Sequence, residues 1–241
     1  MIRLTDSTPY KHFVEREEET VKVTLKKLKQ DFKLYERCFD LCMETFDCMA
    51  KSRESEIVSS KGKDATLIIL PSIMQSVQSI RLLITRGYYY DSAIVVRSLL
   101  ESVGLCTYLS TDDEEANRWV HGKRIKLAGI HLFDYAFGKN DAKVRRLYGL
   151  LCNYVHRNIR SAIYFYRGTH EQKVKKDANT EGGVSVDLQF VPQFDKKEAT
   201  LTSTYPLLVA LMLQEIFKEE LKPYKNIQSK THRLFKLFNS L

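Results

Sequence analysis

Residues 14–57 contain neither glycine nor proline, and their apolar residues recur at alternating steps of four and three. This spacing is typical of a helix that packs one stripe of side chains against other helices. The stripe consists of Val21, Leu25, Leu28, Phe32, Tyr35, Phe39, Cys42, Phe46 and Met49. The flanks are densely charged, so two arrangements remain open. Either the long helix lies against a bundle of its own chain, or it forms a coiled coil with a second subunit.

Shorter helical patterns follow along the rest of the chain, with turn residues between them. Gly87 is placed to close one helix, and Asp64, Asp91 and either Thr111 or Asp112 are placed to cap the next ones. The predicted helices after residue 57 span 64–86, 91–110, 112–138, 140–156, 199–221 and 223–239. The sequence therefore predicts an all-α bundle of six or seven helices, in a single domain over residues 1–241.

Residues 168–197 interrupt the helical pattern. The first half of this insertion is polar, whereas apolar and polar residues alternate over 184–190, as in a half-buried strand. A lone strand needs a partner. Either "SAIYFYRG", just before the insertion, pairs with it in a short β-hairpin, or the insertion is a mobile flap.

The composition is that of a globular protein and gives no sign of a membrane protein. Hydrophobic residues make up 44% of the chain, as in an ordinary globular protein, and the net charge is +8. That charge favours an anionic partner only where one face concentrates it. The most apolar stretch, "ATLIILPSIMQSVQSIRLLI", contains Pro71 and Arg81, which a bilayer span tolerates poorly. The first residues lack the apolar run of a signal peptide, so we expect a cytoplasmic protein that does not enter a membrane.

The cysteines lie within apolar helical patterns and include no CxxC pair, which predicts reduced, buried thiols. Cys38 and Cys42 share a helical face, and metal or redox use of this pair is the alternative. The chain has no glycine-rich phosphate loop, HExxH or GxSxG motif. We therefore expect neither a metal nor a cofactor.

Two charged residues are set into the apolar helix "AIVVRSLLESVGLCTYL", residues 93–109. Arg97 and Glu101 are one helical turn apart and share a face. A buried charge is costly unless it is paired, and an arginine can pair with a carboxylate through two hydrogen bonds. Three roles remain open: an ion pair that fixes the helix, an arginine held by Glu101 to meet an anion such as a phosphate, and a surface pair without consequence.

A second candidate is "LYGLLCNYVHRN", residues 147–158, where Tyr148, Cys152 and His156 form one stripe. His156 ends its helix, where the macrodipole favours the charged imidazolium, so it is either a helix cap or an acid/base group. Residues 143–176 interleave basic and aromatic residues, a composition that suits single-stranded nucleic acid or a solvated basic loop. The candidate ligand-contacting residues here are Arg145, Asn153, Arg157 and Arg160.

The segments "RGYYYDSAIVVRSLLES" and "YGLLCNYVH" together resemble a bacterial helical family that pairs an R-[ST]-L-x-E helix with a Y-x-x-L-[SC]-x-x-x-H helix. That family looks related to the HEPN (higher eukaryotes and prokaryotes nucleotide-binding) bundles, and the resemblance covers roughly residues 65–165. In HEPN nucleases an arginine and a histidine of one helix meet across a dimer and cut RNA without metal. Arg124 and His131 match that spacing, although Ile125 replaces the usual polar residue.

The resemblance implies a cytosolic homodimer that binds or cleaves RNA or a nucleotide, as a toxin or phage-defence effector with an antitoxin or protein partner. In the enzymatic version His156 is the general acid/base, Arg97 stabilises a phosphate and Glu101 orients Arg97. Tyr148 supports them, and the site is assembled from two helices. The alternatives are a non-enzymatic interaction protein that uses the long N-terminal helix and a sensor of a small anionic ligand.

Overall fold

The computed structural model describes residues 9–54, 60–125, 127, 129–137, 142–155, 194, 196 and 204–238. Every helix or strand assigned within these residues is an α-helix, which confirms the all-α prediction. The helices are α1 (Pro9–Lys27), α2 (Lys29–Glu54), α3 (Lys61–Thr85), α4 (Tyr89–Ser110), α5 (Asp113–Val120), α6 (Gly129–Phe137), α7 (Ala142–Val155), α10 (Thr204–Ile216) and α11 (Lys225–Phe238). The alternating segment 184–190, and the β-hairpin predicted for it, lie outside the described residues.

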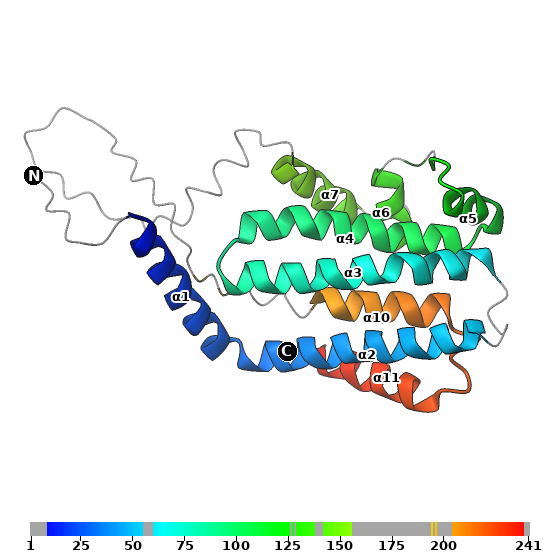
Figure 1. Ribbon diagram of the computed structural model, residues 1–241, viewed down its shortest axis with the longest axis horizontal. Coiled ribbons are helices and arrows are strands. Elements are labelled where there is room, and N and C mark those ends of the chain that lie inside the picture. Colours follow the sequence, from blue (N-terminus) through cyan, green and yellow to red (C-terminus); the bar gives the residue numbers. More distant parts are fainter. Residues whose placement is uncertain are drawn as a thin grey trace, which may run out of the picture.

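The antiparallel helices α3 and α4 form the centre of the bundle (Figure 1). Helices α6 and α7 pack on α4, α5 packs against both α3 and α4, and α2, α10 and α11 cover the opposite side. The largest fully buried side chains include Leu41 of α2, Leu70 of α3, Leu99 of α4, Phe133 of α6 and Leu213 of α10. The core therefore runs through both sides of the α3–α4 pair.

The predicted number of six or seven helices is wrong, because the described residues contain nine. The single helix expected over 14–57 is divided at Leu28, where α1 leaves the bundle at an angle (Figure 1). Helical hydrogen bonds still join Leu28 to Thr24 and Phe32 to Leu28, so the chain bends without unwinding. Leu28 is itself buried, at the point where α1 and α2 meet.

The second division separates α5 from α6, where the sequence predicted one helix over 112–138. Gly122 has a φ of +74°, a left-handed conformation that glycine adopts without strain. The amide of Gly122 donates to Trp119 O and that of Lys123 donates to Arg118 O, the two bonds of a Schellman cap. Gly122 therefore ends α5 two turns after it begins.

Helix ends show which of the capping predictions hold. Gly87 ends α3 with a φ of +84°, and Asp112 caps α5 by accepting from the amides of Glu114 and Glu115, as predicted. Asp64 and Asp91 are not caps, because α3 and α4 begin before them. The start of α3 is bound instead by Asp113 of α5, whose Oδ1 lies 2.9 Å from the amide of Gly62.

The long apolar stripe of α2 is buried in the chain's own core, mainly against α10, α11 and α3. Phe32, Tyr35, Cys42 and Met49 are all buried. This supports the first of the two predicted arrangements for α2, a helix lying against its own bundle. The stripe on α1 differs, because Leu25 is 44% exposed there.

Two central helices, α3 and α4, are long and apolar enough to cross a membrane by length and composition alone. In each helix, 44% of the most apolar window is buried inside the chain, and core helices of soluble proteins share these properties. The α3 side chains that pack inward include Leu70, Ile73 and Val77. The cytoplasmic location therefore stays a prediction.

Candidate functional site

Helix α4 places Arg97 and Glu101 on one face, as the sequence predicts. Arg97 Nε donates a hydrogen bond to Glu101 Oε1 at 3.0 Å, which makes an ion pair one turn long. The two side chains are 18% and 27% exposed, so the pair is neither sealed in the core nor fully solvated. A guanidinium in this position keeps access to solvent while its orientation is fixed.

Helix α7 adds Tyr148 to the pair from the other side. Arg97 Nη2 donates to Tyr148 Oη at 3.3 Å, and the same hydroxyl donates to Glu101 Oε1 at 3.4 Å. The Arg97 Cζ atom also lies 5.3 Å from the centre of the Tyr148 ring, within cation–π range. Arg97, Glu101 and Tyr148 thus form a closed triangle of polar contacts, which we call the Arg97 cluster.

Tyr148 is itself fixed by an aromatic contact to α6. Its ring meets Phe133 edge-on, with ring centres 4.6 Å apart, and Phe133 is fully buried. Edge-on aromatic pairs are a favourable geometry because the positive ring edge faces the negative ring face. The hydroxyl of Tyr148 is therefore presented to α4 by a side chain anchored in the core.

The electrostatics of the Arg97 cluster favour a charged arginine and a protonated tyrosine. Burial lowers the pKa of Arg97, but the hydrogen bond and negative charge of Glu101 outweigh it, so the pKa is raised overall. Burial raises the pKa of Tyr148, as does a hydrogen bond with Cys152, although the charge of Arg97 opposes the shift. At neutral pH the cluster therefore offers a permanent cation and a hydroxyl group.

Gly129, the first residue of α6, contacts the Arg97 cluster and was not predicted. A Cβ atom at this position would lie 2.4 Å from Tyr148 Oη and 2.6 Å from Glu101 Oε1. Both distances are too short for real contacts, so a side chain at position 129 would displace the cluster. The signal in the sequence was a glycine within a helix expected to be continuous, where glycine is unfavourable.

Arg145, predicted to contact a ligand, lies on the same helix as Tyr148 and is 53% exposed. Its Nη2 atom is 3.6 Å from Asp134 Oδ2, in the residue after Phe133. Asp134 is buried, and its Oδ1 atom has no hydrogen-bond partner within the described part of the chain. A second arginine–carboxylate pair therefore joins α6 and α7 beside the Arg97 cluster.

The other predicted site residues are not brought into the cluster. His156, Arg157 and Arg160 lie outside the described residues, and for Asn153 the structure gives its place in α7 but not its side chain. Arg124 and His131 are both exposed, and no hydrogen bond or ion pair between them occurs among the described residues. The described residues thus bring together Arg97, Glu101 and Tyr148, whereas Arg124 lies in the segment before α6 and His131 lies within α6.

Metal binding finds no support in the described ranges, where no three His, Cys, Asp or Glu side chains come together. All five cysteines are free thiols, and Cys38, Cys42 and Cys106 are buried. What the Arg97 cluster can do chemically is bind an anion. Arginine has five N–H donors, of which Arg97 uses two in the bonds to Glu101 and Tyr148.

Comparison with known proteins gives one match. The model of a family of unknown function, DUF5677, matches residues 63–134. This segment runs from the first turn of α3 into α6, so it includes Arg97, Glu101 and Gly129 but not Tyr148. No curated protein and no solved structure matches the chain. Over its central helices the chain is therefore similar to a family whose description assigns no activity.

Proposed function

We propose that this chain is a HEPN-like cytosolic protein that binds a phosphate group of RNA, or of a nucleotide, at Arg97. The observation that carries the proposal is the Arg97 cluster: a permanent cation, oriented by Glu101 and Tyr148 and still 18% exposed. Arginine suits phosphate because its planar fork of donors matches two phosphate oxygens.

The charge of α7 supports an anionic ligand. Residues 142–155 include Arg145 and Arg146, both exposed, and no acidic residue. Positive charge along one helix raises the local concentration of phosphates and steers them toward the surface. Because Tyr148 is on this helix, the same element supplies the positive field and one wall of the Arg97 cluster.

Cleavage would be an extension of binding. His156 directly follows α7, and in the enzymatic version it exchanges the proton while Arg97 stabilises the phosphate charge and Glu101 orients Arg97. Arg145, Asn153, Arg157 and Arg160 would then contact the RNA backbone. We propose this as a metal-independent ribonuclease activity in a homodimer, with a toxin or phage-defence role.

A non-enzymatic interaction role is the second candidate, and α1 favours it. This helix leaves the bundle at an angle (Figure 1), with Leu25 44% and Tyr10 76% exposed. Exposed apolar side chains on a projecting helix are a feature of surfaces that meet a partner protein. Deletion of residues 1–27 would abolish partner capture in this case and leave RNA binding unchanged.

The decisive experiment measures binding of a labelled single-stranded RNA by anisotropy, in EDTA. Arg97→Ala should weaken binding at least tenfold. Arg81→Ala is the matched control, because Arg81 also faces a tyrosine ring at 5.3 Å and pairs with a glutamate, Glu36, at 3.7 Å. It does so from α3 toward α2, away from α4 and α7. Equal weakening by both variants, or none by Arg97→Ala in a folded protein, would overturn the proposal.

The same samples separate binding from cleavage. If wild type cuts the RNA in EDTA and His156→Ala binds it without cutting, the chain is a ribonuclease. If wild type binds but never cuts, a sensor or binding role remains. Circular dichroism of each variant shows whether the helices are intact, which keeps a loss of binding distinct from a loss of fold.

A further inference from the structure

A hollow lies beside α4, one turn beyond Glu101, and most of the side chains that line it are apolar. It has a volume of about 370 Å³ and is formed by side chains of α4, α5, α6 and the segment between the last two. Ligand sites in proteins commonly start near this size. The apolar side chains that line it are Leu105, Trp119, Ile125, Leu127 and Leu132.

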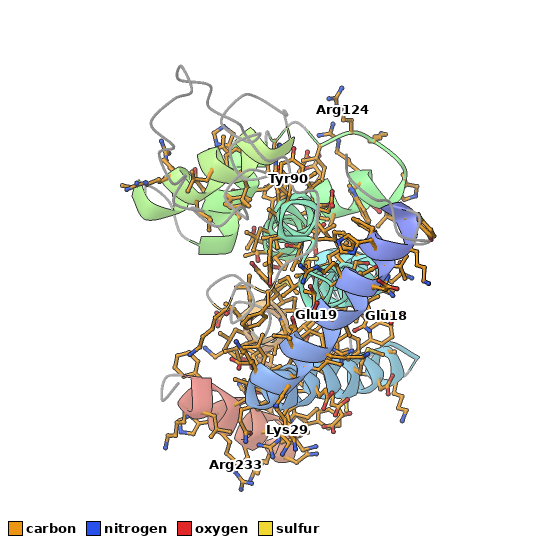
Figure 2. All side chains as sticks on the ribbon, turned by 90° about the vertical axis from the view of Figure 1, so that its left-hand side faces the viewer. Glu18, Glu19, Lys29, Tyr90, Arg124 and Arg233 are labelled. Carbon is orange, nitrogen blue, oxygen red and sulfur yellow. The ribbon has the colours of Figure 1, made fainter. Side chains whose placement is uncertain are left out.

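Two cations stand at the rim of this hollow. Lys123 and Arg124 line it, both are exposed, and neither side chain makes an ion pair within the described ranges. Figure 2 shows Arg124 extending into solvent at one end of the molecule. Their position follows from the left-handed turn at Gly122, which ends α5 and directs the next residues past Trp119. The hollow therefore combines an apolar floor with a positive edge.

We propose that this hollow binds an anionic amphiphile, a small molecule with an aliphatic body and one carboxylate-like head. The body would displace water from the leucine and isoleucine side chains, and the head would meet Lys123 and Arg124. An aliphatic body fits better than a nucleobase, because among the described residues of the apolar floor Trp119 alone has a hydrogen-bonding side chain, with a single donor. The site is separate from the Arg97 cluster and does not depend on it.

Trp119 is the only tryptophan of the chain, so its fluorescence reports on this hollow alone. The full-length protein would be titrated with decanoate below its micelle concentration, and in parallel with decanol. We expect a saturable change in emission with decanoate and at least fivefold weaker binding of decanol. The double variant Lys123→Ala/Arg124→Ala should bind decanoate as weakly as decanol.

Two further variants complete the test. Arg233→Ala/Lys236→Ala removes two exposed positive charges from α11, and Figure 2 shows Arg233 and Arg124 at opposite ends of the molecule. This control should bind decanoate like wild type, and so should Arg97→Ala. Leu127→Asp, in the segment before α6, should abolish binding with its helix content unchanged.

Three results would overturn the inference: no saturable response to decanoate, equal binding of decanoate and decanol, or a response to adenosine monophosphate that decanoate cannot displace. The last would assign the hollow to a nucleotide instead. Because Arg97→Ala is expected to change RNA binding but not this titration, failure here and failure of the proposed function are distinguishable.

Discussion

Arg97 and Tyr148 meet across two helices, with the guanidinium donating to the phenol oxygen at 3.3 Å and lying over its ring at 5.3 Å. The two residues are 51 positions apart in the sequence, and no pattern in the residues around either one predicts that they are in contact. The contact ties α7 to the centre of the bundle through a polar group that faces solvent. Substitutions that remove one contact at a time therefore distinguish a packing role of this contact from a role in ligand binding.

Tyr148→Phe removes the hydroxyl and keeps the ring. Arg97 retains Glu101, so we expect a loss of only about 0.5–1.5 kcal/mol in the free energy of unfolding. RNA affinity should fall further, because the guanidinium loses one of its two fixed contacts. Urea unfolding followed by circular dichroism measures the loss in the free energy of unfolding. Tyr10 is 76% exposed, so Tyr10→Phe is the control that should leave stability unchanged. Unchanged stability and affinity would show that the hydroxyl contributes nothing.

Much of the bundle follows from local sequence, and the outcome at particular residues shows why. Gly87 ends α3 and Asp112 caps α5 as predicted, because a left-handed glycine and a side-chain acceptor act within a few residues. The pair of Arg97 and Glu101 was likewise predictable, since helical geometry alone brings side chains four apart together. Each of these predictions depended only on residues close together in the sequence, within one helix or at its end.

The failures involve contacts between helices. No glycine or proline near Leu28 predicts a break, yet the helix is divided there, at a residue that is buried in the bundle. Asp113 binds the start of α3 from 51 residues away, and Gly129 fits under Tyr148 and Glu101 only once α4, α6 and α7 are assembled. Tyr148 was predicted as a site residue, but no local pattern links its hydroxyl to Arg97.

Gly104→Ala tests the closeness of α4 and α6. A Cβ atom on Gly104 would lie 1.9 Å from Leu132 O, a backbone atom that cannot move without shifting α6. We expect the free energy of unfolding to fall by about 1–3 kcal/mol or more, the cost of forcing extra volume into a packed contact. Gly149→Ala on α7 is the matched control, because a Cβ there meets nothing within 4 Å. That exchange should stabilise the helix by about 0.5–1 kcal/mol. Equal changes in the free energy of unfolding for the two variants would contradict the close approach of α4 and α6 at Gly104.

The cysteines should react unequally with a thiol reagent. Burial raises the pKa of Cys38 to about 12 and that of Cys106 to about 12, so both thiols are protonated and shielded at mildly alkaline pH. Cys42 is also buried, and its thiol donates to Pro206 O at 3.4 Å. In the native protein Cys48 and Cys152, which are partly exposed, should be modified first. Peptide mapping after brief labelling identifies them, and early modification of Cys38 and Cys42 would revive a redox role for that pair.

Asp113→Ala tests the contact between α5 and the start of α3. Ser60 Oγ and the amide of Gly62 both donate to Asp113 Oδ1, at 2.6 and 2.9 Å, and these bonds lower the pKa of the carboxyl group below its ordinary value. Losing such a cap costs about 1 kcal/mol at neutral pH. Asp91→Ala, in the first turn of α4 but without a capping bond, should cost little.

The dependence of this effect on pH has a definite sign. Because the folded protein binds the Asp113 proton less tightly than the unfolded chain does, the contribution is complete above the unfolded pKa of about 3.9. It disappears as the pH falls through the lower, folded pKa. Urea unfolding at neutral pH and at about pH 3 should therefore show a gap between wild type and Asp113→Ala that narrows in acid. A gap of constant size would mean that the carboxylate charge has no part in holding α3.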